Sequence, residues 1–336
     1  MVRLGSTPVL DFGSFSVKAG FAGESYPLLV YTQEQFHPNP WPIVRGRIED
    51  WQLIELLIQT IWSKLRVEPS EEEVILVEYS GTSPEEHRKM EILMFEKFKV
   101  RYLTFLPAAL CTCQAAGVPT GIMVNFGHGV TRISAVIDNL AKKEVELPLG
   151  GQDSTSHLAT SLQTRYPDQG DLAIHSREIK ERHSFASLNP ALETEAVGST
   201  AKSLQRTYAM PDETEIVLDR ERASCIEPIF SSVKGSGDET VASVTKQLIN
   251  DFPERSAELA QNIVICGGPT DCTNFNYRLL SELYKCKASK IVRIFCPPER
   301  TFTCWVGASV IYFDDDYVDQ GMSLNEYNFK YLPAEQ

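Results

Sequence analysis

The sequence predicts an α/β protein built from two related domains. Two segments, residues 9–23 and 121–137, each contain an apolar strand, a turn with glycine and a returning strand. Predicted strands and helices then alternate along the chain, which is typical of α/β folds. A length of 336 residues also fits about two domains of ~150 residues each.

Three elements follow the first hairpin, after a connection at residues 37–42 that prolines interrupt. Residues 51–65 place apolar side chains at helical spacing and predict an amphipathic helix. Residues 73–78 (EVILVE) predict a buried strand, and residues 84–98 predict a second helix. Ser83 is the expected N-cap of that helix, because Pro84 and two acidic residues occupy its first turn.

The second half repeats the plan from residue 121, with a strand, a turn and a strand that returns over residues 130–137. Residues 151–237 are more polar and helical, with turn signals near 209–212 and 235–237. A strand at residues 262–265 ends in two glycines and precedes a helix that continues through residue 284. Residues 291–295 predict another strand, and residues 304–313 predict a closing helix.

Composition excludes several classes of partner. The chain has 32 Lys and Arg against 45 Asp and Glu, a net charge of −13, so direct binding to nucleic acid or to an anionic membrane surface is not expected. Neither a secretory leader nor an apolar run of about 18 residues is recognisable, so we expect an intracellular protein without a membrane span. The eight cysteines form no CxxC pair, and we expect reduced thiols rather than a zinc site.

Three turns that directly follow apolar strands are candidate phosphate sites. They contain DFG at residues 11–13, NFG at 125–127 and GG at 267–268. Backbone N–H groups at tight turns bind anions, and glycine lets the backbone approach a ligand. Each turn alone would usually be an ordinary turn, but their shared position after a strand favours phosphate binding. Neither GxxxxGK[ST] nor GxGxxG is present, which excludes a P-loop and a dinucleotide fingerprint.

Residues 9–24 (VLDFGSFSVKAGFAGE) resemble the first phosphate hairpin of actin. Further similar segments follow in actin order at residues 42–51, 125–138, 179–188, 262–268, 296–300, 305–309 and 326–327. The chain is thus similar to actin over nearly its whole length and is identified as a divergent actin-related or actin-like protein. The resemblance implies an actin/Hsp70/sugar-kinase-like fold of two RNase H-like lobes with a nucleotide cleft between them.

The same resemblance implies lobe boundaries. The first lobe comprises residues 1–115 and 303–336, with the small second subdomain of actin reduced to a short stretch near residues 36–42. The second lobe comprises residues 116–302. It divides into residues 116–149 with 238–302, and residues 150–237.

Many of the family's nucleotide contacts are kept. The resemblance implies that ATP or ADP, with Mg²⁺, binds at these positions, and that Asp11 is the remaining group that holds hydrated Mg²⁺ through water. For Lys180 and Glu181 a solvated helix face is the alternative. The matching positions are Asp11, Gly13, Ser14, Lys18, Gly127, Gly129, Arg177, Lys180, Glu181, Gly267 and Gly268.

The positions that serve hydrolysis in the family differ here. Ala108 stands where actins have the glutamine that orients the attacking water, and Asn125 replaces an aspartate that organises Mg²⁺. His128 replaces a second aspartate, and Arg132 replaces a histidine that assists proton transfer. Phe15 replaces a glycine of the first phosphate loop, so we expect its side chain to obstruct the approach of a phosphate to the backbone. Because positioning and electrostatics supply nearly all the catalysis of phosphoryl transfer, we expect hydrolysis to be very slow or absent.

Surfaces that build actin filaments are also altered. Residues 36–42 replace the small subdomain whose loop grips the next actin subunit, and residues 231–238 are shorter than the segment that makes lateral contacts. Asp314, Asp316 and Gln320 replace apolar or neutral residues of the cleft where amphipathic helices dock on actin. A solvated acidic helix face is the simpler interpretation of these aspartates. The N-terminus MVRLG lacks the acidic tail of actin.

These departures favour a non-catalytic structural subunit of a larger cytoskeletal assembly in the cytoplasm, with at most weak ATP binding. It would cap or terminate an actin-like filament, as the actin-related protein at the pointed end of dynactin does, or belong with testis-type actin-like proteins. Its partners would be other actin-family subunits or complex-specific proteins. A nuclear subunit of a chromatin-remodelling complex is the alternative, and an active ATPase or sugar kinase is a third hypothesis that Ala108 and Asn125 oppose.

Overall fold

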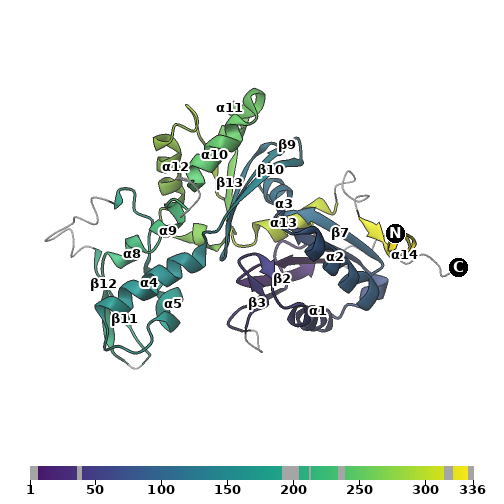
Figure 1. Cartoon of the computed structure of the whole chain (residues 1–336), viewed down its shortest axis with the longest axis horizontal. Coiled ribbons are helices and arrows are strands. Elements are labelled where there is room, and N and C mark those ends of the chain that lie inside the picture. The colour runs from purple at the N-terminus through teal and green to yellow at the C-terminus, as the bar shows by residue number, and fades with distance from the viewer. Residues whose placement is uncertain are drawn as a thin grey trace. The chain divides into compact units, whose positions relative to one another are not determined.

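The computed structural model describes residues 7–35, 40–190, 204–211, 213–233, 239–313 and 321–331. The chain forms two compact units (Figure 1). The first comprises Met1–Met123, Ser134–Glu144 and Pro297–Gln336, and the second comprises Val124–Ile133 and Val145–Cys296. The lobe boundaries at residues 115–116 and 302–303 stay a prediction.

Several stretches that the sequence analysis connects with filament and partner surfaces lie outside the described residues. They are the N-terminal MVRLG, residues 36–39 of the reduced subdomain, residues 234–238, and the stretch 314–320 that contains Asp314, Asp316 and Gln320.

The first unit is organised around a mixed sheet with the strand order β15-β7-β6-β1-β2-β3. β1 pairs with β6 and β6 with β7 in parallel, whereas β1–β2, β2–β3 and β15–β7 are antiparallel. The strands are β1 (Pro8–Phe12), β2 (Ser16–Phe21), β3 (Leu29–Thr32), β6 (Glu73–Glu78), β7 (Tyr102–Pro107) and β15 (Met322–Ser323).

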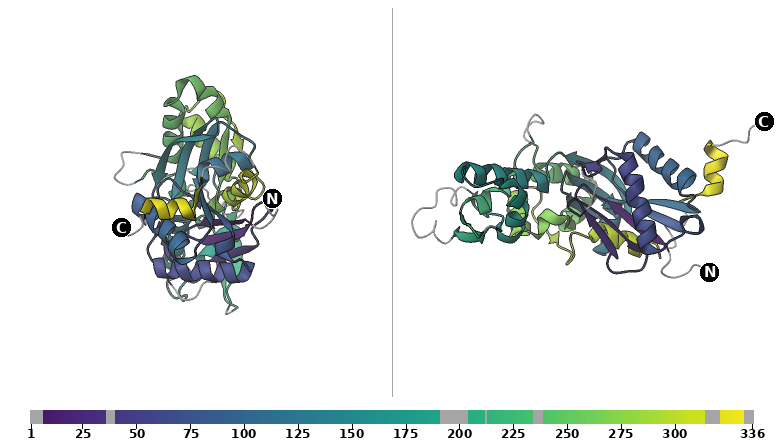
Figure 2. Two further views of the ribbon diagram at one scale, coloured as in Figure 1. Left: turned by 90° about the vertical axis from the view of Figure 1, so that its right-hand side faces the viewer. Right: turned by 90° about the horizontal axis from the view of Figure 1, so that it is seen from below.

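One face of this sheet is covered by α1 (Trp51–Leu65), α2 (Pro84–Ile92) with its continuation η2 (Leu93–Lys97), and α14 (Leu324–Tyr331). Their apolar side chains form one core with the strands, in which Leu10, Leu57 and Tyr327 are fully buried. The hydroxyl of Tyr327 donates to Glu96 Oε1 at 2.6 Å, which links α14 to η2. In Figure 2, α14 is the yellow helix nearest the C-terminus.

The other face of the sheet is covered by α3 (Ala108–Ala115) and α13 (Thr303–Ile311). The indole Nε1 of Trp305 donates to the carbonyl of Val9 at 2.9 Å, next to Gly20, whose missing side chain leaves room for the ring. The first unit is therefore a three-layer α/β/α structure. A short hairpin of β4 (Ile43–Val44) and β5 (Arg47–Ile48) and a 3-10 turn η1 (Pro69–Glu71) lie between the larger elements.

The local signals in the sequence explain these helices. Asp50 caps α1 by accepting from the N–H groups of Gln52 and Leu53. The predicted N-cap Ser83 starts α2, where it forms a capping box with Glu86. The predicted elements at residues 51–65 and 73–78 are confirmed. The helix predicted for residues 84–98 needs a correction, because it is α-helical only to Ile92 and then π-helical over Leu93–Lys97.

A second sheet has the order β10-β9-β8-β13-β14. Its strands are β8 (Gly121–Phe126), β9 (Thr131–Ile137), β10 (Leu140–Leu147), β13 (Ile263–Cys266) and β14 (Ile294–Phe295). The strand predicted at residues 291–295 is thus shorter than expected. In the second unit the ring of Phe275 packs edge-on against Phe126, with the centroids 4.8 Å apart. The associated helices are α10 (Val241–Asn250), α11 (Ser256–Gln261) and α12 (Phe275–Lys285), with the 3-10 turns η3 (Pro253–Arg255) and η4 (Gly268–Asp271).

The rest of the second unit is mainly helical. It contains α4 (Gly151–Arg165), α5 (Ala173–His183), α8 (Glu221–Ser224) and α9 (Glu227–Phe230), with a hairpin of β11 (Arg206–Ala209) and β12 (Glu215–Leu218). Arg278, only 5% exposed, joins α12 to α9 through two hydrogen bonds to the Glu227 carboxylate and a third to the Ser187 carbonyl. Removing one partner of Arg278 would therefore leave a buried charge without full compensation.

None of the helices in the described ranges is both long and apolar enough to cross a membrane. All eight cysteines are free thiols, as expected.

Candidate functional site

The first glycine turn joins β1 to β2. The Gly13 amide donates to the Ser16 carbonyl at 3.0 Å, and a Cβ at Gly13 would lie only 2.9 Å from that oxygen. The carbonyl of Gly13 accepts from Trp41 Nε1 at 3.2 Å. The turn is tight enough to require glycine, and contacts within the first unit hold it in place.

The carboxylate of Asp11, on β1 of this hairpin, contacts two side chains. Asp11 and Lys18 face each other in the β1–β2 register, and Lys18 Nζ lies 3.1 Å from Asp11 Oδ2. The hydroxyl of Tyr79 donates to Asp11 Oδ1 at 3.0 Å. Asp11 is 1% exposed and Lys18 is 8% exposed. Both carboxylate oxygens are therefore engaged by groups of the protein itself.

Tyr79 is not among the residues predicted from the sequence. A signal was available, because Tyr79 directly follows β6, and β6 pairs in parallel with β1 so that Asp11 lies opposite Val77. Residues that follow adjacent parallel strands meet at one edge of a sheet. The predicted strands alone did not establish which strands are neighbours.

The remaining residues of the first turn also have partners. The Ser14 hydroxyl accepts from the Gly46 amide at 2.7 Å, which links the turn to the loop between β4 and β5. Phe15 is partly exposed, and its carbonyl accepts from the Gln33 amide at 2.8 Å. That Phe15 obstructs a phosphate stays a prediction.

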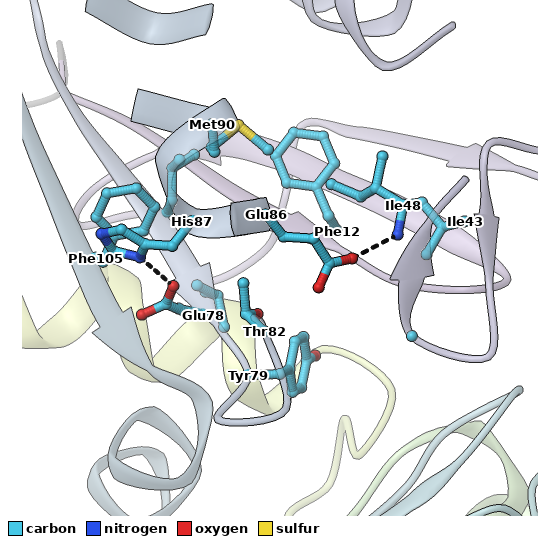
Figure 3. A pocket seen from close by; sticks show the side chains of 13 residues that line it. Phe12, Ile43, Ile48, Glu78, Tyr79, Thr82, Glu86, His87, Met90 and Phe105 are labelled. Atoms are coloured by element: carbon cyan, nitrogen blue, oxygen red, sulfur yellow. Dashed lines mark hydrogen bonds and ion pairs between the residues drawn. The ribbon is translucent and has the colours of Figure 1, made fainter. Parts of the chain in front are cut away.

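A small cavity of about 60 Å³ lies beside this hairpin in the first unit (Figure 3). On one side His87 Nδ1 lies 2.5 Å from Glu78 Oε1, and on the other Glu86 accepts from the Ile48 amide at 3.2 Å. The hydrogen bond to Glu78 raises the pKa of His87. The cavity has room for water but is too small for a nucleotide. Its lining includes Phe12, Gly46, Tyr79, Met90 and Phe105.

The second turn, between β8 and β9, is locked onto the start of α4. The Gly127 amide donates to the Val130 carbonyl at 2.9 Å. The Gly151 amide donates to the Gly127 carbonyl and the Gln152 amide to the His128 carbonyl, at 2.9 and 2.8 Å. These first-turn amides of α4 are thus already satisfied by the turn. Gly129, the other predicted contact, belongs to the same turn.

The third turn packs directly against the second. Gly267 has a φ of +94°, and a Cβ there would lie 2.1 Å from the Phe126 carbonyl and 2.9 Å from the Asn125 side-chain oxygen. Only glycine suits this position. A Cβ at Gly268 would instead meet open space. The structure therefore brings together the predicted sites around Asn125, Gly127 and Gly267.

The α5 residues divide into buried and exposed positions. Lys180 Nζ donates to the Gly151 carbonyl at 2.9 Å and to Thr155 Oγ1 at 2.8 Å, and burial lowers its pKa. Lys180 thus ties α5 to the start of α4 beside the second turn. Glu181 is exposed and pairs with Arg177 at 3.5 Å along the helix.

The positions that differ from the family's hydrolytic residues have structural contacts. Ala108 is buried at the start of α3, where its carbonyl accepts from Thr112 Oγ1 at 2.9 Å. Arg132 is 5% exposed and lies 2.7 Å from Glu146 Oε2. Asn125 is also buried, at 8% exposure, and carries no charge.

The actin family model matches residues 39–329, which is most of the chain. The chain belongs to the actin family. Actin-family proteins share a two-lobed α/β fold and generally bind ATP or ADP with Mg²⁺. The family includes both ATPases and non-catalytic relatives, so membership alone does not decide whether a chain hydrolyses ATP.

The residues of this actin-family chain fit a nucleotide in part. Lys18 in the first unit supplies a buried positive charge beside Gly13, with its Nζ 3.6 Å from a Cβ built there. Lys180 in the second unit supplies another beside the second turn. Gly268 leaves open space next to a glycine turn. In each unit taken by itself, a buried lysine or an open glycine turn is therefore of the kind that binds phosphate oxygens.

The same residues do not fit Mg²⁺. Magnesium prefers octahedral oxygen ligands, usually keeps several waters, and is held through one or two carboxylates together with phosphate oxygens. Asp11 is sealed by Lys18 and Tyr79, and Asn125 offers an amide where the family has an acid. Across the described parts of the chain, no three His, Cys, Asp or Glu side chains gather as a metal site. These contacts argue against the metal role expected for Asp11.

Proposed function

We propose that this chain is a structural, non-hydrolysing actin-family subunit of a larger cytoskeletal assembly, and that it terminates an actin-like filament. The observation that supports this most directly is the environment of the substituted hydrolytic positions. Ala108 and Asn125 are buried, and Arg132 is paired with Glu146.

Each substitution removes a specific catalytic ability. A methyl group at Ala108 cannot orient an attacking water, and the Asn125 amide cannot act as a base. Arginine stays protonated in proteins, so Arg132 cannot accept a proton as the family's histidine does. Because several groups are absent together, the chemical step loses most of its positioning and its electrostatic stabilisation.

Termination is supported by the length of one connection. Only residues 33–42 separate β3 from β4, where actins have a whole small subdomain that grips the next subunit. A subunit without that loop lacks one longitudinal contact. It would join a filament through its remaining surfaces and stop further growth.

Nucleotide binding is proposed to be weak. The charge of Lys18 is already largely compensated by Asp11, so less of it is available to a phosphate. The proposed location is the cytoplasm, within the cytoskeleton, because the proposed neighbours are other actin-family subunits.

Purification of the tagged full-length chain from its own cells, followed by mass spectrometry, tests this function. We expect other actin-family subunits at a fixed ratio to the tagged chain, and their absence from a tag-only control. Recovery with the ATPase subunit of a chromatin remodeller would instead establish the nuclear alternative. Recovery of a monomer without partners would contradict a structural role.

A further inference from the structure

Tyr79 contacts the carboxylate of Asp11, the group that the resemblance to actin assigns to hydrated Mg²⁺. Its hydroxyl donates to Asp11 Oδ1 at 3.0 Å, while Lys18 holds Oδ2 at 3.1 Å. Sixty-eight residues separate Tyr79 from Asp11, so the contact comes from the β1–β6 pairing rather than from the hairpin itself. A hydrogen bond to a charged carboxylate is among the stronger kinds in proteins.

We propose that Tyr79 closes Asp11 to divalent cations, so that the first turn binds a nucleotide phosphate without Mg²⁺. The proposal rests on the weak nucleotide binding of the proposed function and specifies how that site works. It follows from the mismatch between the Asp11 environment and a hydrated magnesium ion.

The partners of Asp11 explain why its carboxylate needs no cation. Asp11 and Lys18 neutralise each other, and the Tyr79 hydroxyl satisfies the remaining carboxylate oxygen. To admit the water shell of Mg²⁺, the protein would have to break the Tyr79 bond inside a site where Asp11 is 1% exposed.

Lys18 keeps the ability to bind a phosphate. Lysine has three N–H donors, and its contact with Asp11 uses one of them. The ammonium also lies next to the turn itself, 3.6 Å from a Cβ built on Gly13. The phosphate partner is therefore a fixed side chain rather than a bound cation.

Titration of the full chain with a fluorescent ADP analogue, in millimolar Mg²⁺ and in EDTA, tests the proposal. For the wild type we expect the two dissociation constants to agree within about threefold. Tyr79→Phe removes the hydroxyl and frees Asp11 Oδ1, so Mg²⁺ should tighten its binding by about tenfold, the factor expected for one hydrogen bond to a charged group. Tyr26→Phe, at a 52% exposed tyrosine of the same unit, is the matched control and should behave like the wild type.

The outcomes separate this proposal from the proposed function. Wild-type binding that Mg²⁺ tightens by tenfold or more overturns the proposal and leaves weak nucleotide binding standing. A Tyr79→Phe variant that folds but gains no response to Mg²⁺ overturns the role of Tyr79. If no analogue binds under either condition, both this proposal and weak nucleotide binding fail, while the structural role still depends on the purified partners. The wild-type comparison needs no variant and so does not depend on the folding of Tyr79→Phe.

Discussion

At the scale of single residues, the second and third turns of this protein show why glycine is needed at one position and not at its neighbour. Gly267 has a left-handed backbone and faces the Phe126 carbonyl. Gly268 has no positive φ, and its Cα faces open space. The sequence analysis treats the two glycines as one pair, because the φ angle and the approaching oxygen are properties of the folded chain.

Gly267→Ala should therefore destabilise the second unit strongly. The new Cβ would lie 2.1 Å from a backbone oxygen at a φ of +94°, and we expect a loss of roughly 3 kcal/mol in the free energy of unfolding. Gly268→Ala is the matched control and should stay within about 0.5 kcal/mol of the wild type. Urea denaturation followed by circular dichroism measures both. Equal stability of the two variants would mean that the turn is not packed as described.

At the scale of elements, strands and helices with local signals were predictable, and those that depend on distant partners were not. The 51–65 helix has both an apolar stripe and the Asp50 cap, so its ends are set by neighbouring residues. The spacing of apolar residues does not predict the change to π-helix after Ile92. Its i→i+5 bond, from the Phe98 amide to the Leu93 carbonyl at 3.2 Å, is established only in the packed structure.

In the candidate site, too, residues with a local sequence signal were predicted, and a residue that depends on a distant partner was not. The glycine turns were predicted because each directly follows an apolar strand, and Lys18 was predicted through the resemblance to actin. Tyr79 was missed, because its role depends on the pairing of β1 with β6. The hairpin of β11 and β12 was marked only by its turn, because its four-residue strands are too short for a clear alternating pattern.

The contact between α2 and β6 gives a prediction at this scale. His87 on α2 hydrogen-bonds to Glu78 at the end of β6 and lies 3.7 Å from Glu91. Both carboxylates raise the pKa of His87, whereas Lys330 on α14 lowers it. The raised pKa means that protonated His87 stabilises the folded state. This contribution is complete below the unfolded pKa of about 6.5 and is lost as the pH rises through the higher folded value.

Urea denaturation at about pH 6 and about pH 8 measures this contribution. The stability advantage of the wild type over His87→Gln should shrink as the pH rises. Glu78→Gln removes the largest cause of the shift and should reduce the pH dependence in the same way. A constant difference between the wild type and His87→Gln at both pH values would contradict the described ion pair.

At the scale of the whole molecule, family membership favours nucleotide binding, whereas the contacts of the site residues do not favour hydrolysis. The actin family match gives the fold, and proteins of this family generally bind ATP or ADP. The described contacts of Asp11, Arg132 and Lys180 direct these side chains toward partners within the protein. The proposed function accounts for this combination, because a structural subunit needs the actin architecture but not the chemical step.

The most direct test of that account is phosphate release from ATP by the purified full-length chain, in saturating ATP with millimolar Mg²⁺. We predict release at the rate of a protein-free control, because Ala108 cannot orient the attacking water and neither the Asn125 amide nor the Arg132 guanidinium can accept its proton. Sustained release of several phosphates per minute from each protein molecule would contradict the account.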